Sequence, residues 1–392
     1  MRQERIEIID VLRGFALLGI ILVHFTEQYY AGQLPKIHEN LGAHHLADSI
    51  VEALIGIFIM GKFFMIFSFL FGLSFFIQLD KSDGSPSFLI RFAWRLICLF
   101  CIGLLHHLHY RGDILTIYAL LGFGLLLLYR LPNKALLVVA LLLVFNIPSV
   151  ALRLYDVIAG ATPNVMAEVD QKPLEIYYDT LKSGSYLEII KANWYELKSK
   201  FEFQIEFGRI YITLGLFLLG LYAGRKKWFD EIQIFKKLIR FGLWALLSCV
   251  VVAGAMALII FILKIEMTQA QQFLVGGFVY DVFNASLAAI YVGLVVLAFQ
   301  KERRYQLLMN FYEVGRMGLT TYLTQALVGT LLLFSYGFGL LGEYGAATWS
   351  AIAIVVFGLQ IVFSKWWLAH FYYGPVELLW RSMTYLKLQP LK

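Results

Sequence analysis

The sequence predicts an all-α membrane protein, a polytopic bundle of about ten transmembrane helices. Of its 392 residues, 60% are hydrophobic and 15% are charged, whereas soluble domains carry about 25% charged residues. Apolar runs long enough to cross a bilayer recur along the whole chain. Lys and Arg gather at the ends of those runs, as in membrane proteins of fixed orientation. We therefore expect one transmembrane domain over residues 1–392 and exclude a soluble or disordered chain.

The expected spans follow in order from the apolar runs. They are 8–28, 50–79, 89–108, 113–129, 135–152, 207–224, 240–263, 273–299, 311–335 and 346–369. The first run contains Asp10 and Arg13, which is too polar for a cleaved signal peptide. The second run is longer than a bilayer requires, so we expect it to tilt or kink. Three cysteines, all inside apolar runs, exclude a disulfide scaffold.

The distribution of basic residues predicts the orientation. With both termini in the cytosol, the inner segments hold nineteen Lys and Arg residues, and the short outer loops hold only Lys36, Arg111 and Lys264. This bias favours a multi-pass protein of the bacterial cytoplasmic membrane with an N-in, C-in topology. Segment 153–206 then lies outside as an amphipathic loop, and 370–392 forms a cytosolic amphipathic tail.

The external segment 153–206 contains a predicted amphipathic helix. Its apolar residues recur at helical spacing at Leu187, Ile190, Trp194 and Leu197. We expect this helix to lie at the membrane surface, either as a cap over the bundle or as a lid facing a substrate.

Ionisable residues in the first span predict a functional stripe, because charges inside a membrane are costly. Asp10 and Arg13 are three residues apart and can pair near the inner surface. Arg13 and His24 share one helix face and lie about 16 Å apart along the axis. His24 suits proton abstraction near neutral pH. The alternatives are an anchoring role for Arg13 and an interfacial hydrogen bond for His24.

Three further cations are candidates for binding an anionic acyl donor. Lys62 lies in the middle of an apolar run, which calls for a counter-ion or an anionic ligand unless its ammonium reaches an interface. Arg91 and Arg95 share a face of the third predicted span and offer two guanidinium forks to phosphates. As residues at the inner boundary, they would equally serve to set the topology.

A histidine cluster ends the third predicted span. His106 and His109 share a helix face, but only Asp113 is near enough in sequence to complete a metal-ligand set, so we expect no metal. Asp113 begins the next span and would either cap that helix or fix the tautomer of His106 or His24. We also expect no haem between His24 and His106.

The C-terminal part adds a last group of polar residues. Arg316 opens the ninth predicted span, and Thr320, Thr321, Tyr322 and Gln325 form a polar stripe that should face protein or a water-filled cavity. After the last span, a Gly-Pro break precedes Glu377 and Arg381, which fits a helix on the inner surface with structural or charge-pairing roles for both residues.

Taken together, these motifs resemble a known family over nearly the whole chain. The motifs are Asp10-x-x-Arg13-Gly14, Lys62-Phe63 with Phe67-Ser68-Phe69-Leu70-Phe71-Gly72, Gly103-Leu104-Leu105-His106, Gly112-Asp113-Ile114-Leu115, Gly184-Ser185-Tyr186, Gly315-Arg316-Met317 and Gly374-Pro375-x-Glu377-x-x-Trp380-Arg381. The set is similar to that of the YeiB-type domain-of-unknown-function family, to which a transport role is sometimes attached.

At superfamily level, the opening resembles transmembrane acyltransferases of the acyltransferase-3 and heparan-glucosaminide acetyltransferase types. Acyltransferase-3 proteins carry an Arg, ten residues and a His in the first helix, a pattern that Arg13 and His24 reproduce. Their third span carries an Arg-x-x-Arg pair, and here Arg91 and Arg95 are one residue further apart. The resemblance implies transfer of an acyl group across the membrane from acyl-coenzyme A.

Two hypotheses of function follow. In the first, Arg13, Arg91, Arg95, Lys62 and Arg316 bind cytosolic acyl-CoA as co-substrate, and His24, or His106 oriented by Asp113, deprotonates a hydroxyl or amine of a small-molecule or glycan acceptor at the outer face. In the second, the protein is a transporter or flippase for a small anionic or lipid-linked compound. No inverted repeat and no paired broken helices are evident in the sequence, which speaks against transport. Membrane lipid is an expected partner, nucleic acid is not, and homo-oligomerisation stays open.

Overall fold

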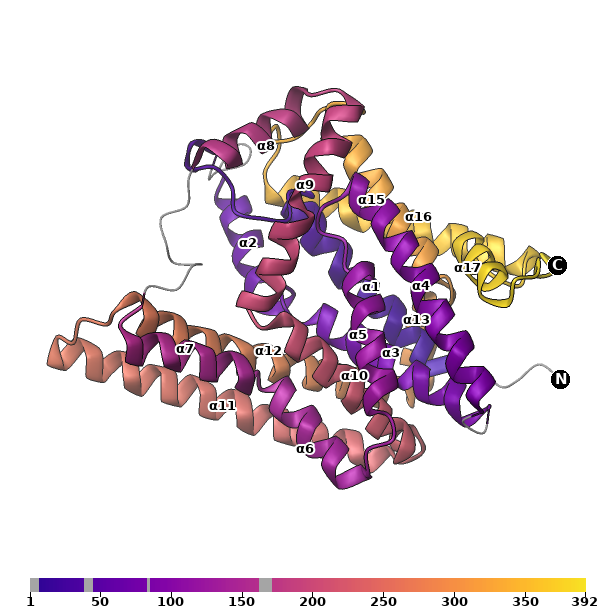
Figure 1. The fold of residues 1–392 in the computed structure, drawn as a ribbon, viewed down its shortest axis with the longest axis horizontal. Coiled ribbons are helices and arrows are strands. Elements are labelled where there is room, and N and C mark those ends of the chain that lie inside the picture. Colours follow the sequence, from indigo (N-terminus) through magenta and orange to yellow (C-terminus); the bar gives the residue numbers. More distant parts are fainter. Residues whose placement is uncertain (1–6, 39–44, 83–84, 162–170) are drawn as a thin grey trace.

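The computed structural model describes residues 7–38, 45–82, 85–161 and 171–392, and these are helical with no strand (Figure 1). Arg2 and Arg5, which entered the charge count, and 162–170 of the predicted external loop lie outside the described residues. The α-helices are α1 (Glu7–Thr26), α2 (Leu46–Phe58), α3 (Phe63–Asp80), α4 (Pro86–His109), α5 (Leu115–Leu128), α6 (Asn133–Val144), α7 (Ile147–Ala159), α8 (Gln171–Ser183), α9 (Tyr186–Glu206), α10 (Arg209–Arg225), α11 (Ile232–Leu263), α12 (Gln269–Phe299), α13 (Glu302–Leu308), α14 (Asn310–Arg316), α15 (Gly318–Leu333), α16 (Ala346–His370) and α17 (Pro375–Tyr385). Two short 3₁₀ helices are η1 (Lys36–His38) and η3 (Trp228–Asp230).

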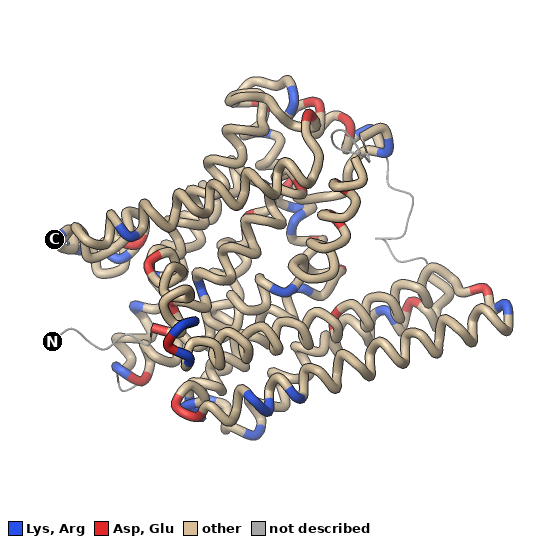
Figure 2. The backbone as a smooth tube through the Cα atoms, turned by 180° about the vertical axis from the view of Figure 1, so that it is seen from behind, with Lys and Arg blue, Asp and Glu red and all other residues tan. Residues whose placement is uncertain are grey.

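The helices confirm a polytopic helical membrane protein. Six helical segments in the described part of the chain are long and apolar enough to cross a membrane. The count rises to eight if each of two bent pairs, α6 with α7 and α9 with α10, forms one span. Two shorter apolar helices, α5 and α15, account for the remaining predicted spans. Most charged residues lie at helix ends and connections, and a few lie inside the bundle (Figure 2).

Three helix breaks interrupt the apolar part of the chain. The predicted run over 50–79 is broken between α2 and α3. Asn146, in the left-handed region at φ 55°, separates α6 from α7, and the two helices bend by 47°. Gly208, at φ 68°, separates α9 from α10, which bend by 68°. The sequence did not reveal these breaks.

Helix α1 runs through the interior of the bundle and contacts α3, α14, α15 and α16. Gly14 and Gly315 mark its closest approach to α14, because an added Cβ would overlap the carbonyl oxygen of Phe311 or of Asp10. Two backbones can approach this closely only where small residues face each other. Arg13 directly precedes Gly14, and Arg316 directly follows Gly315. The crossing therefore fixes the positions of both arginines.

Helices α11 and α12 pack against each other and, with α7, project from the rest of the bundle (Figure 1). Little of α11 is buried, and its exposed side chains are apolar. An apolar helix with an apolar exposed face is typical of a lipid-facing span.

The predicted amphipathic helix is present as α9. Its Leu187 and Trp194 are exposed, whereas Asn193 and Lys200 are buried. Helix α9 packs along α4, and α8 packs beside it (Figure 1). In a lipid environment the apolar side faces outward, so the polar side turns into the protein.

Candidate active site and ligand cavity

One cavity of about 2550 Å³ brings together most of the residues singled out from the sequence. Its lining comes chiefly from α1, α3, α4, α9, α12 and α17 and from the connection between α4 and α5. Of the predicted site residues, the lining includes Asp10, Arg13, His24, Arg91, Arg95, Asp113, Arg316, Glu377 and Arg381. Residues as far apart in sequence as Asp10 and Arg381 therefore line one cavity.

Five arginines lie at one end of this cavity: Arg13, Arg91, Arg95, Arg316 and Arg381. Arg13 forms an ion pair with Asp10 and donates to Ser74 of α3, which confirms the predicted pairing. Arg95 donates to Gln78 at 2.9 Å, and its guanidinium lies 3.8 Å from the ring centroid of Trp380. Several guanidinium groups around one space are a strong anion-binding arrangement.

Helix α17 holds this arginine-rich end together. Trp380 donates from its indole nitrogen to the carbonyl of Arg95 at 3.0 Å. The guanidiniums of Arg91 and Arg381 lie 5.1 and 5.0 Å from the ring of Tyr385. The aromatic side chains of α17 therefore orient cations that would otherwise repel one another.

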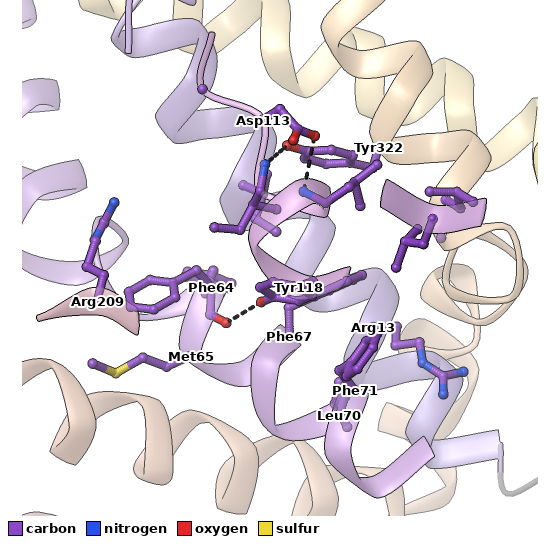
Figure 3. Close-up of a pocket in the computed structure, with 18 of the residues that line it drawn as sticks. Arg13, Phe64, Met65, Phe67, Leu70, Phe71, Asp113, Tyr118, Arg209 and Tyr322 are labelled. Carbon is purple, nitrogen blue, oxygen red and sulfur yellow. Dashed lines mark hydrogen bonds between the residues drawn. The ribbon is translucent and has the colours of Figure 1, made fainter. Parts of the chain in front are cut away.

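Aromatic side chains line the middle of the cavity. Figure 3 shows Phe67, Phe71 and Tyr118 between Arg13 and the pair formed by Asp113 and Tyr322. The hydroxyl of Tyr118 lies 2.6 Å from that of Ser68, so the polar atom is satisfied and the ring supplies the surface. An apolar passage with polar groups at both ends suits a long ligand with a charged head and an apolar tail.

His24 lies at the end opposite the arginines. Its ring centroid is 5.2 Å from that of Tyr110, 5.4 Å from that of Tyr29 and 6.2 Å from that of Tyr322. In the described part of the chain, its imidazole has no hydrogen-bond partner. Because α1 is continuous from Glu7 to Thr26, the predicted stripe from Arg13 to His24 is present on one unbroken helix.

Asp113 fulfils both roles that the sequence left open. Its Oδ1 accepts from Nδ1 of His106 at 2.9 Å, and its oxygens accept from the backbone nitrogens of Leu115 at 3.1 Å and Thr116 at 3.0 Å. It therefore caps the start of α5 and fixes the tautomer of His106. The free lone pair of His106 is then on Nε2, which has no partner among the described residues.

A buried lysine completes this cluster. Lys200 of α9 donates to Thr116 at 2.7 Å and to Nδ1 of His107 at 3.2 Å, and lies 3.5 Å from Oδ2 of Asp113. Its ammonium balances the carboxylate in a place where an unpaired charge would be costly. Sequence reasoning placed Lys200 in an external loop and did not select it.

The three histidines of this cluster bind different groups. His107 donates from Nε2 to the carbonyl of Asn193 at 2.8 Å, and His109 contacts the hydroxyl of Tyr186 at 2.8 Å. The described residues contain no group of three His, Cys, Asp or Glu side chains placed to hold a metal ion.

Lys62 lies apart from the cavity lining. Its ammonium donates to the carbonyls of Gly56 at 3.1 Å and Met60 at 2.8 Å, where α2 ends. It also lies 5.2 Å from the ring of Phe283. The charge is thus stabilised by backbone carbonyls that the helix break leaves without intrahelical donors.

Glu377 caps a helix from a distance. It accepts from the backbone nitrogens of Leu319 at 2.7 Å and Thr320 at 3.0 Å and from the hydroxyl of Thr320. The predicted polar stripe of α15 is buried: Thr320, Thr321, Tyr322 and Gln325 all face the interior. Glu377 therefore fixes the N-terminus of the helix that carries Tyr322 to the histidine end.

A second polar group borders the cavity and was missed from the sequence. It consists of Arg153, Arg209, Asp281 and Asn284, on α7, α10 and α12. Asp281 lies well inside the predicted span 273–299, so the rule that ionisable residues within spans are candidates would have found it.

Comparison with known proteins shows which family the chain belongs to. Residues 223–387 match the family described as "Protein of unknown function (DUF418)". The chain is 32% identical to the "Uncharacterized protein YxaH" of Bacillus subtilis (strain 168), with 100% of this chain and 97% of the relative covered. This chain belongs to the YeiB-type family of proteins of unknown function. It is 26% identical to the "Uncharacterized protein YeiB" of Escherichia coli (strain K12), with 97% of both chains covered.

A third relative is the "Uncharacterized 39.9 kDa protein in amylase 3'region" of Bacillus acidopullulyticus, at 27% identity over 99% of this chain and 96% of the relative. No solved structure matches the chain. The predicted resemblance to the YeiB-type family is thereby confirmed, and the acyltransferase resemblance stays a prediction.

Proposed function

We propose that the protein is a membrane-bound acyltransferase that moves an acyl group from cytosolic acyl-CoA to a hydroxyl or amine at the outer face of the bacterial cytoplasmic membrane. The observation that carries this proposal is the single cavity with five arginines at one end and His24 at the other. A protein that only anchored or scaffolded partners would have no need of such a lined passage.

The donor fits the cavity in three parts. The phosphates and the nucleotide of coenzyme A would contact Arg91, Arg95 and Arg381, with Arg13 and Arg316 further in. The pantetheine arm would run along α1 past Phe67 and Phe71. From Arg13 to His24 the helix rises about 16 Å, a length that an extended pantetheine arm spans.

The chemistry requires one base. The acceptor oxygen or nitrogen attacks the thioester carbonyl carbon and forms a new ester or amide bond, and the carbon–sulfur bond breaks. His24, which lines the cavity, would take the acceptor proton and pass it to the departing thiolate. His106, held by Asp113, would act behind it as a positioning residue or as the base itself. The acceptor would be a sugar or another envelope molecule, and membrane lipid the surrounding partner.

Binding of coenzyme A tests the donor site. Purified protein should bind acetyl-CoA saturably in calorimetry, and Arg95→Ala should weaken binding by about ten- to a hundredfold, since a charge-assisted hydrogen bond is lost. Arg130→Ala is the matched control, because Arg130 is exposed and outside the cavity lining. His24→Ala should keep acetyl-CoA binding and lose transfer. Absent binding, or equal effects of the two arginine variants, would refute the donor site.

A second candidate function is transport, which the interrupted spans favour. Transporters commonly build their substrate sites from discontinuous helices, and three helix breaks border or adjoin this cavity. Proteoliposomes provide the discriminating experiment. Flux of an envelope precursor without any acyl donor would favour transport, and product formation that depends on acyl-CoA would favour acyl transfer.

A further inference from the structure

The three helix breaks converge on one stretch of α12. A Cβ added at Gly61, in the break between α2 and α3, would lie 2.9 Å from the amide nitrogen of Asn284. Asn146, in the break between α6 and α7, donates to Asp281 at 2.9 Å and to the carbonyl of Phe207, beside the third break, at 3.3 Å. Non-helical backbone at membrane depth is tolerated where it is buried in protein or lines a cavity.

Polar groups without partners face this place, which we call the break chamber and define by Asn146, Arg153, Asp281 and Asn284. Asn284 is fully buried and lines the cavity, yet neither its amide nitrogen nor its amide oxygen has a hydrogen-bond partner among the described residues. The same holds for Nε of Arg153 and for the side-chain oxygen of Asn146. Folded proteins keep few such groups, and each calls for an explanation.

The charges of the break chamber are balanced. Nη1 of Arg153 lies 3.9 Å from Oδ2 of Asp281. Arg209 interacts electrostatically with Asp281 on one side and with Glu27 on the other. Two cations thus face two carboxylates, in contrast to the arginine-rich end. The balance disfavours a charged ligand, and the unpartnered amides offer both donors and acceptors, which is what hydroxyl groups require.

We propose that the break chamber binds an uncharged, hydroxyl-rich molecule of the sugar or polyol class. The break chamber is linked to the outer end of α1 through Arg209, which interacts electrostatically with Glu27, three residues after His24. This link suits a role as acceptor site. The role as acceptor rests on the proposed acyl transfer, whereas the binding itself does not.

Thermal unfolding tests the binding. The full chain is purified in a detergent without a sugar headgroup and titrated with glucose, N-acetylglucosamine and glycerol, with glucose 1-phosphate as the charged counterpart. At least one uncharged probe should raise the melting temperature in a saturable way, because a ligand that binds the folded state stabilises it. The phosphate ester should do so less. No shift with any uncharged probe, or a larger shift with the phosphate ester, would overturn the proposal.

Variants distinguish a binding site from a merely structural one. Asn284→Leu replaces an unpartnered amide with an apolar group of similar shape, so the ligand-free protein should melt at the same or a higher temperature. The same variant should weaken the response to the sugar by about tenfold or more. Asn133→Leu, at an exposed site outside the cavity lining, is the control and should respond like the unaltered protein. A sugar response retained in Asn284→Leu, or a lower melting temperature without ligand, would contradict the assignment.

The two proposals fail separately. Sugar binding is measured without acyl-CoA, and acetyl-CoA binding is measured without sugar. Acetyl-CoA binding without any sugar binding would refute the proposal for the break chamber and leave the proposed donor site standing.

Discussion

Glu377 shows how a single carboxyl connects the C-terminal helix to the interior. Burial raises the pKa of Glu377, while the hydrogen bonds from Thr320 and Leu319 oppose that rise. A carboxyl whose pKa is higher in the folded than in the unfolded protein stabilises the fold most at low pH. That contribution is fully present below the ordinary value of 4.5 and is lost as the pH rises through the folded-state pKa.

Glu377→Gln removes this titration. The difference in melting temperature between the unaltered protein and the variant should therefore be largest below pH 4.5 and shrink as the pH rises. Thermal unfolding in detergent across this range measures it. A difference that grows with rising pH would show that the carboxylate form is the one stabilised by the fold.

Lys62 is expected to contribute to the stability of the folded protein and not to the binding of the acyl donor. Lys62→Met should destabilise the protein by about 1–3 kcal/mol, because the carbonyls of Gly56 and Met60 lose their donor. It should leave the affinity for acetyl-CoA unchanged, since Lys62 lies outside the cavity lining. Denaturation and calorimetry on the same preparation check both parts. Unchanged stability with lost acetyl-CoA binding would restore the role expected from the sequence.

Some of these site residues could be predicted from the sequence and others could not, for physical reasons. Asp10, Arg13 and His24 were recognisable because their spacing on one helix fixes their relation. The partner of Lys62 was not recognisable, because backbone carbonyls become available only where a helix stops. The pairing of Lys200 with Asp113 joins segments 87 residues apart in sequence, and no local pattern encodes it.

At the scale of elements, the crossing of α1 and α14 depends on two glycines. Gly315→Ala should destabilise the protein by about 1–3 kcal/mol, because the new methyl group would overlap the carbonyl of Asp10. Gly318→Ala is the matched control, since its nearest neighbour is a side-chain atom of Leu17 at 3.9 Å. That change should be neutral or stabilising by about 0.5–1 kcal/mol. Equal effects of the two substitutions on thermal unfolding would contradict the close crossing.

Long apolar helices were predictable from composition, and their interruptions were not. Asn146 lies in an otherwise apolar run, and its left-handed backbone is stabilised by a hydrogen bond to Asp281, 135 residues away. Which side of α9 faces the protein was likewise not predictable from the sequence. Amphipathic spacing shows that two faces differ, but the surroundings decide which face is buried.

For the whole molecule, the central claim is that one passage joins an anion-binding end to a base. The structure places Arg13 and His24 in the lining of the same cavity. The membrane class followed from composition alone, whereas the shared cavity needed the full set of helix packings. The acyl group should lie near His24, Tyr110 and Tyr322 when the nucleotide is bound by the arginines.

Photocrosslinking tests this most directly. The purified protein is irradiated with an acyl-CoA that carries a diazirine at the end of its acyl chain, and the labelled peptides are identified by mass spectrometry. We predict labels on α1 around His24 and on α15 around Tyr322, which excess acetyl-CoA removes. Labels confined to the lipid-facing helix α11, or labels that excess acetyl-CoA does not displace, would contradict the account.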